Sequence, residues 1–260
     1  MGNFAFQRVV LSGLFTLGLL TGLPRLGQAQ TPQPLPPELQ NTLNQLEAAA
    51  NRQDLNAVMR FYSPTFTTSD NLAASALARG LEGLWREYNG LSYDIEVQNW
   101  QMEGDDLIAE TLTQVSGTRF EGQQPVRLRS EVRSRQRINR QTQQINSQEI
   151  LTERTLIFIG ERPPNVDINL PEQVRAGETF DFDVIVQEPL EGDLLMGAAL
   201  EEAVTANYLS QATFDLELLQ AGGIFKRGRI APNAGDQWFS AVLIRGDGMT
   251  MVTQRVRVGD

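Results

Sequence analysis

The sequence predicts an α+β region at residues 38–160, followed by an all-β region at residues 163–260. Apolar residues recur at helical spacing as far as Tyr88, and at the two-residue spacing of strands after it. Beyond Pro163 and Pro164 the apolar runs become short, and turn signals separate them about every ten residues. We therefore expect three helices with a curved antiparallel sheet, and then an antiparallel β-sandwich.

Residues 1–29 have the features of a secretory signal peptide. Arg8 precedes the apolar run Val9–Leu23, and small residues close the segment. We expect cleavage after Ala29. The alternative, an uncleaved anchor, fits less well because the apolar run has about 15 residues, whereas a membrane span needs about 20. The prolines of residues 30–37 predict an extended spacer. The mature chain is thus expected to be exported, with no membrane span.

Three helices are expected in the first region. The first spans Glu38–Asn51, where leucines form one stripe, and the second begins at Asp54, which can cap it. Pro64 ends the second helix, because proline lacks an amide donor and disfavours helical backbone in the residue before it. The third helix spans Leu72–Tyr88, with a side-chain cap from the Asp70–Asn71 pair.

Alternating apolar and polar residues predict strands throughout the rest of the chain. Four long strands complete the first region: Leu91–Trp100, Leu107–Thr118, Val126–Asn139 and Gln144–Ile159. Shorter ones make up the second region: Val166–Leu170, Thr179–Gln187, Leu194–Leu200, Thr213–Leu219, Ile224–Arg229, Trp238–Arg245 and Met249–Val258. The turns between them indicate antiparallel neighbours.

The composition limits the chemistry that this chain can perform. It contains no histidine, which excludes imidazole bases and histidine-ligated metals, and no cysteine, which excludes disulfides and thiolate chemistry. The formal net charge is −10, and loss of Arg8 and Arg25 with the leader makes it −12. An acidic chain lacks the positive surface that nucleic acids require. We expect no cofactor, no metal and no nucleic-acid partner.

The stretch RQDLNAVMRFYSPTFTTSD at residues 52–70, with the helix and strands that follow it, resembles the nuclear transport factor 2-like (SnoaL-like) superfamily. The resemblance covers residues 38–160. It implies a cone of three helices and a curved antiparallel sheet, with a pocket between the helices and the concave face of the sheet. Members of the superfamily isomerise steroids, cyclise polyketides, bind ligands or serve as interaction modules.

The second region has a resemblance of its own. The stretches LPEQVRAGETFDFDVIV at residues 170–186 and FSAVLIRGDGMTMVTQRVRV at residues 239–258 resemble the opening and closing strands of bacterial immunoglobulin-like domains. The whole arrangement is similar to uncharacterised exported proteins of cyanobacteria. This similarity implies a place in the periplasm, the thylakoid lumen or the extracellular space.

Asp70 is the candidate catalytic residue. The resemblance implies that the general-base aspartate of the enzymes falls eight residues after Tyr62, at Asp70. The tyrosine that stabilises the oxyanion in those enzymes would fall near Leu46, which has no donor. Asp70 is therefore expected either as a general base or, more simply, as a helix cap.

Aromatic residues can line the implied pocket. The candidate ligand-binding residues are Tyr62, Phe66, Trp85, Tyr88 and Trp100, together with Glu110. The alternative is that the aromatic side chains pack as ordinary core. Glu110 belongs to an alternating strand, and the sequence leaves open which face it points to.

The predicted strand Val126–Asn139 carries arginines at most of its odd-numbered positions and apolar residues at most of its even-numbered ones. The expected register of the next strand places Glu149 opposite Arg133 and Glu153 opposite Arg129, which would neutralise much of this basic stripe. We expect a solvated face, or a homodimer through the face that bears Arg129 and Arg133, in preference to an anion site.

These features predict an exported, non-catalytic binding or interaction protein. Its first region is expected to hold a small apolar ligand or a partner chain. The alternative is an isomerase- or cyclase-type enzyme that uses Asp70 as general base. A further alternative is a structural module of the cell envelope, whose pocket is filled by its own aromatic side chains.

Overall fold

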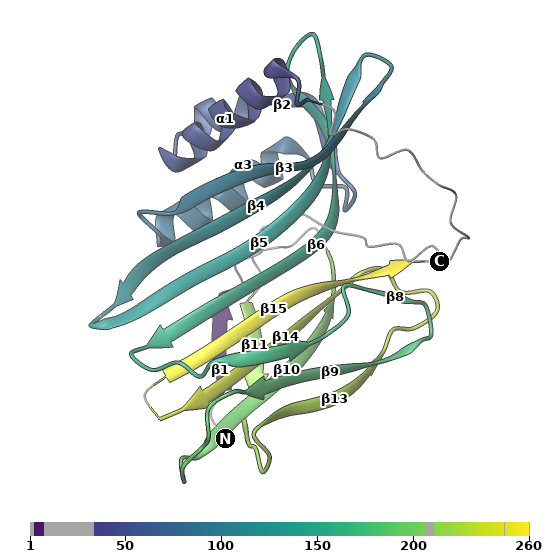
Figure 1. Ribbon diagram of the computed structural model, residues 1–260. Coiled ribbons are helices and arrows are strands. Elements are labelled where there is room, and N and C mark those ends of the chain that lie inside the picture. Colours follow the sequence, from purple (N-terminus) through teal and green to yellow (C-terminus); the bar gives the residue numbers. More distant parts are fainter. Residues whose placement is uncertain (1–2, 8–33, 206–210, 247, 260) are drawn as a thin grey trace.

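Figure 1 shows a computed structural model that describes residues 3–7, 34–205, 211–246 and 248–259. Its dominant feature is one long, twisted sheet that extends through the whole molecule. Helices lie against this sheet at one end, and a small sheet packs near the other (Figure 1).

The helices are α1 (Pro37–Asn51), α2 (Leu55–Met59) and α3 (Ala74–Glu87). The strands of the first region are β2 (Tyr62–Thr68), β3 (Ser92–Glu103), β4 (Asp106–Glu121), β5 (Gln124–Asn139) and β6 (Ile145–Gly160). The later strands are β7 (Val166–Asn169), β8 (Gln173–Arg175), β9 (Thr179–Val186), β10 (Leu195–Ala203), β11 (Gln211–Asp215), β12 (Glu217–Leu218), β13 (Gly223–Arg229), β14 (Gln237–Arg245) and β15 (Gly248–Gly259). Most of the predicted helices and strands are thus confirmed, and β2 and β8 are additions.

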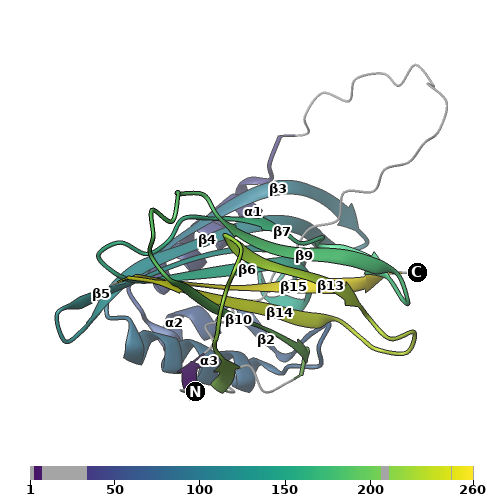
Figure 2. The same ribbon diagram turned by 90° about the horizontal axis from the view of Figure 1, so that it is seen from below.

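The large sheet has ten strands and joins both halves of the sequence. Its order is β12-β10-β14-β15-β6-β5-β4-β3, with β2 also paired to β6 and β8 to β15. The two halves meet at the antiparallel pair β6–β15, from Gly160 opposite Gly248 to Arg154 opposite Gln254. Figure 2 shows β15, β14 and β10 following β6 across the molecule. A separate three-stranded sheet has the order β13-β9-β7.

The fold class expected from the sequence is wrong. The chain is mostly β, and strands from both sides of Pro163 and Pro164 form one sheet, instead of an α+β cone followed by a separate immunoglobulin-like sandwich. The reason is physical. Side-chain alternation identifies a strand, but the backbone N–H and C=O groups that pair it with a neighbour are the same in nearly every residue. The side-chain alternation within β6 or within β15 therefore does not show that these two strands pair.

The large sheet has a hydrophobic core on each face. The consecutive residues Met251 and Val252 of β15 belong to different cores, because neighbouring side chains of a strand point to opposite faces. The inner face, defined as the side of Met251, packs against α1, α2 and α3. On the outer face, the side of Val252, the Phe239 ring packs edge-to-face on Phe180 and Phe182 of β9, with centroids 5.4 and 5.5 Å apart.

The turns before α2 and α3 differ in how they are held. Asp54 caps α2 as expected, since its Oδ1 accepts the backbone N–H of Ala57 at 2.9 Å. The expected cap of α3 by the Asp70–Asn71 pair is wrong, because α3 begins after Ala73 and has no side-chain cap. Thr68 holds this turn instead, and its Oγ1 accepts the backbone N–H of Asp70 at 3.2 Å. The carboxylate of Asp70 therefore takes no part in capping.

Residues 8–33, which hold most of the predicted leader and spacer, lie outside the described residues. Asn3–Gln7 form β1, which pairs antiparallel with β11. Within the part of the chain that the structure describes, no helix has both the length and the apolar character needed to cross a membrane.

Candidate functional site

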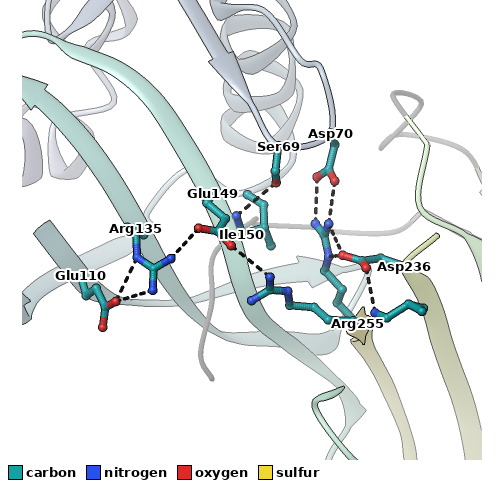
Figure 3. Close-up of polar contacts among 10 residues, drawn as sticks. Ser69, Asp70, Glu110, Arg135, Glu149, Ile150, Asp236 and Arg255 are labelled. Carbon is teal, nitrogen blue, oxygen red and sulfur yellow. Dashed lines mark hydrogen bonds and ion pairs between the residues drawn. The ribbon is translucent and has the colours of Figure 1, made fainter. Parts of the chain in front are cut away.

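Asp70 forms an ion cluster with Arg255 and Asp236 (Figure 3). Arg255 Nη1 and Nη2 donate to the two carboxylate oxygens of Asp70 at 2.8 and 2.6 Å. Arg255 Nε and Nη2 also donate to Asp236 Oδ2, at 2.9 and 2.6 Å. The other Asp236 oxygen accepts the backbone N–H of Val258 at 3.0 Å. One guanidinium group thus connects the turn before α3, strand β15 and the loop before β14.

This cluster is largely withdrawn from solvent. The side chain of Arg255 is 2% exposed, and those of Asp70 and Asp236 are 11% and 21% exposed. Burial alone would lower the pKa of Arg255, but its hydrogen bonds and charge interactions with Asp70 and Asp236 outweigh burial, so its pKa is raised above the ordinary value. Both oxygens of Asp70 are therefore bound to a permanent cation, which is a structural arrangement.

The aromatic candidates gather in one core under the helices. Phe66, Trp85 and Tyr88 are buried, and Tyr62 and Trp100 are partly buried against the same core. The rings of Tyr62 and Phe66 meet edge-to-face with centroids 4.8 Å apart. The structure brings the five side chains together as packed core.

Two tyrosines of this core stay neutral over the physiological range. Desolvation raises the pKa of Tyr62 to about 12, and it raises that of Tyr93 to about 12 as well. The hydroxyl of Tyr93 accepts a hydrogen bond from Trp85 Nε1 at 2.8 Å. These phenols can exchange hydrogen bonds, but at neutral pH they cannot serve as bases.

Glu110 lies on the other face of the sheet from the aromatic residues. Trp100 pairs with the residue before it on β4, so Glu110 points outward. Its Oε1 accepts hydrogen bonds from Arg135 Nε and Nη2 at 3.1 and 2.8 Å. Arg135 Nη1 donates to Glu149 at 2.8 Å, and Arg257 donates to the other oxygen of Glu149 at 3.0 Å (Figure 3). These ion pairs neutralise one end of the basic stripe.

The expected partners along the basic stripe are wrong by register. Glu149 lies opposite Arg135 rather than Arg133, and Glu153 lies opposite Val132, on the inner face. Two β-bulges, one between Arg133 and Ser134 and one between Arg137 and Ile138, shift the pairing of β5 with β6. Neither carboxylate therefore faces the arginine that the unbroken register assigned to it.

The turn before α3 holds the bulge between Arg133 and Ser134 in place. Ser69 Oγ accepts the backbone N–H of Ile150 at 3.3 Å, and the backbone N–H of Ser69 donates to the carbonyl of Gln148 at 2.9 Å (Figure 3). The backbone groups at the bulge thus find partners outside the β5–β6 ladder. A bulge that depends on a distant serine cannot be predicted from the side-chain alternation of either strand.

The other end of the basic stripe lines an open groove of about 570 Å³. Its sheet wall consists of Arg127 and Arg129 on β5 and Phe158 on β6, all on the outer face. The guanidinium of Arg129 lies over the Phe158 ring, 5.9 Å from the centroid. Arg127 Nη2 donates to the carbonyl of Gly160 at 3.3 Å.

Two connecting segments complete the groove. They are the linker after β6 and the loop between β9 and β10, at residues 187–194, with Arg245 beside them. The backbone N–H of Asn165 donates to the carboxylate of Glu188 at 3.2 and 3.1 Å, which ties the linker to the loop. Arg245 Nε donates to Asp193 at 3.0 Å and holds the far end of the loop.

Sequence reasoning did not identify this groove. The alternating arginines were a correct signal for its sheet wall, since Arg127 and Arg129 are exposed on one face of β5. The remaining walls come from segments that are distant in sequence. The sequence of an acidic loop does not show which strand the loop folds over.

Comparisons with known proteins match parts of the chain. Residues 161–259 match a family profile described as a domain of unknown function (DUF8623). No curated protein matches the sequence.

Several solved structures are similar to part of this chain. A putative SnoaL-like polyketide cyclase from Shewanella denitrificans OS-217 is 10% identical, with a TM-score of 0.32, over 44% of this chain and 90% of that one. AusH from Aspergillus nidulans is 13% identical, with a TM-score of 0.36, over 51% of this chain and 90% of that one. Bd1075 from Bdellovibrio bacteriovorus is 14% identical, with a TM-score of 0.33, over 44% of this chain and 39% of that one. Likeness at these scores carries no argument about ligand or activity.

Proposed function

We propose that this chain is an exported, non-catalytic binding protein whose ligand occupies the groove between the sheet and the loop 187–194. The observation that carries the proposal is the groove itself. Its volume of about 570 Å³ falls in the range of about 300–1,000 Å³ in which proteins bind small molecules. The lining includes four arginines and four carboxylates, so the proposed ligand is polar rather than the small apolar molecule expected from the sequence.

The surroundings of Asp70 support binding in preference to isomerase or cyclase chemistry. A carboxylate that acts as a general base must be able to reach a proton of the substrate. Both oxygens of Asp70 instead accept hydrogen bonds from Arg255, whose side chain is 2% exposed. The chain also contains no histidine or cysteine that could act in its place.

The packing of the aromatic residues supports the groove as the place of binding. Phe66 is 2% exposed and Tyr88 is 1% exposed, so a ligand beside them would have to displace core side chains. In the groove, by contrast, Arg127 and Arg129 are already exposed.

Native mass spectrometry of the protein purified from its own host tests the proposal. Export predicts a mature chain that begins at Gln30, and binding predicts an additional mass on that chain. Phe158→Ala is expected to lose the additional mass, because it removes the ring on which Arg129 lies. The matched control is Phe225→Ala, since Phe225 is 55% exposed and lies outside the groove.

Each part of the proposal can fail separately. A wild-type chain without additional mass would contradict the binding function. An additional mass that survives Phe158→Ala would place the ligand elsewhere. A chain that retains residues 1–29 in the host would contradict export.

A further inference from the structure

The sheet wall of the groove carries arginines and the loop wall carries carboxylates, and this difference deepens the proposed function, on which the inference rests. Arg127 and Arg129 alternate on β5, so both project from the outer face, about 7 Å apart along the strand. The loop wall contributes Glu188, Glu191 and Asp193. A ligand in the groove therefore meets cations on the sheet side and carboxylates on the loop side.

Arg129 is prepared to receive a planar anion. The Phe158 ring lies beneath its guanidinium and restricts where this group can move, and the guanidinium N–H groups remain able to donate. Among the described residues Arg129 makes no ion pair, and Arg127 uses one nitrogen for the carbonyl of Gly160. Two neighbouring guanidinium groups of this kind suit a carboxylate, which accepts paired hydrogen bonds.

Glu191 is the available anion of the loop wall. Glu188 is used by Asn165 and Asp193 by Arg245, so these two carboxylates hold the loop. Glu191 is exposed at the turn of the loop, where its φ is +50°, and it makes no ion pair with any described residue. Its carboxylate therefore remains free to meet a cationic group.

We propose that the groove binds a dipolar ligand, a free amino acid or a short peptide. Its carboxylate would lie on Arg127 and Arg129, and its protonated amine would point toward Glu191. Equal numbers of arginines and carboxylates in the lining favour a ligand without net charge, because a simple anion would meet as much repulsion as attraction. The chain's net charge of −10 adds to the repulsion of a simple anion.

A pool of Gly-X-Gly tripeptides, with X each uncharged amino acid, tests this by native mass spectrometry on recombinant protein that carries no additional mass. We expect members of the free pool to bind, and the N-acetylated and C-amidated pools to bind at least about tenfold more weakly. Arg129→Gln and Glu191→Gln should each weaken binding of the free pool by about tenfold. The control is Arg227→Gln, since the Arg227 side chain is 77% exposed and lies outside the groove.

The outcomes separate this inference from the proposed function. Equal binding of the N-acetylated pool would overturn the dipolar assignment in favour of a simple carboxylate. If no pool binds although host-purified protein carries a mass that Phe158→Ala removes, the inference falls and the proposed function stands. If host-purified protein is also bare, both fall.

Discussion

At the scale of single residues, the contact with Arg255 determines the role of Asp70, the candidate catalytic carboxylate. Asp70 has a residue type and spacing that suit a general base, and its sequence neighbours indicate no partner. The guanidinium that binds it lies 185 positions later. Local patterns could therefore identify Asp70 as a residue to examine, but its role depends on a contact that neither segment reveals alone.

Asp70→Asn should lower the free energy of unfolding by about 2–3 kcal/mol. Breaking a buried ion pair typically costs about 3–5 kcal/mol, and here Asp236 remains to bind Arg255. Urea denaturation followed by circular dichroism measures the change. Asp181→Asn is the control and should cost less than about 0.5 kcal/mol, because that side chain is 60% exposed. Equal effects of the two substitutions would contradict the structural role of the cluster.

At the scale of elements, the existence of strands was predictable and their register was not. The predicted strand Val126–Asn139 differs from β5 by two residues at one end, because alternation is a local property. Its pairing with β6 depends on a bulge that Ser69 stabilises from another part of the chain. A bulge changes only the partners beyond it. The bulge between Arg133 and Ser134 therefore displaces Glu153, whereas the register nearer the hairpin, with its own bulge between Arg137 and Ile138, displaces Glu149.

A double-mutant cycle between Arg135 and Glu149 tests the observed register. The two side chains meet at 2.8 Å and are 40% and 35% exposed, so we expect a coupling of about 0.3–1 kcal/mol. The free energies of unfolding of wild type, Arg135→Ala, Glu149→Ala and the double variant supply it. The register expected from the sequence pairs Glu149 with Arg133 instead, so a stronger coupling in the Arg133–Glu149 cycle would contradict the observed register.

At the scale of the whole molecule, the single sheet has an outer face that is covered unequally. The three-stranded sheet packs over β14 and β15. On β3, β4 and β5 the same face carries Glu96, Leu112 and Arg133 in register with one another across the three strands. Neighbouring strands are about 4.8 Å apart, so Glu96 and Arg133 lie about 10 Å apart with Leu112 between them.

This row is complementary to itself, and we propose that it joins two copies of the chain. A two-fold axis that passes Leu112 parallel to β4 would place the two leucines in contact and Glu96 of each copy against Arg133 of the other. Size-exclusion chromatography with light scattering should therefore show a dimer. Arg133→Glu and Glu96→Arg should each give a monomer, because each single variant places like charges opposite one another at both ends of the row.

Because the row pairs with itself, restoring the dimer with a second substitution is more informative than disrupting it with one. The double variant, which exchanges the two charges, should form a dimer again, because both contacts regain opposite signs. An equimolar mixture of the two single variants should also form dimers, since each end of the row then pairs Glu with Arg. Loss of the dimer in the single variants without rescue in the mixture would mean that the substitutions act on folding, and a monomeric wild type would exclude this interface. Arg129 is two rows away, at the groove, so Arg129→Gln should leave the dimer intact.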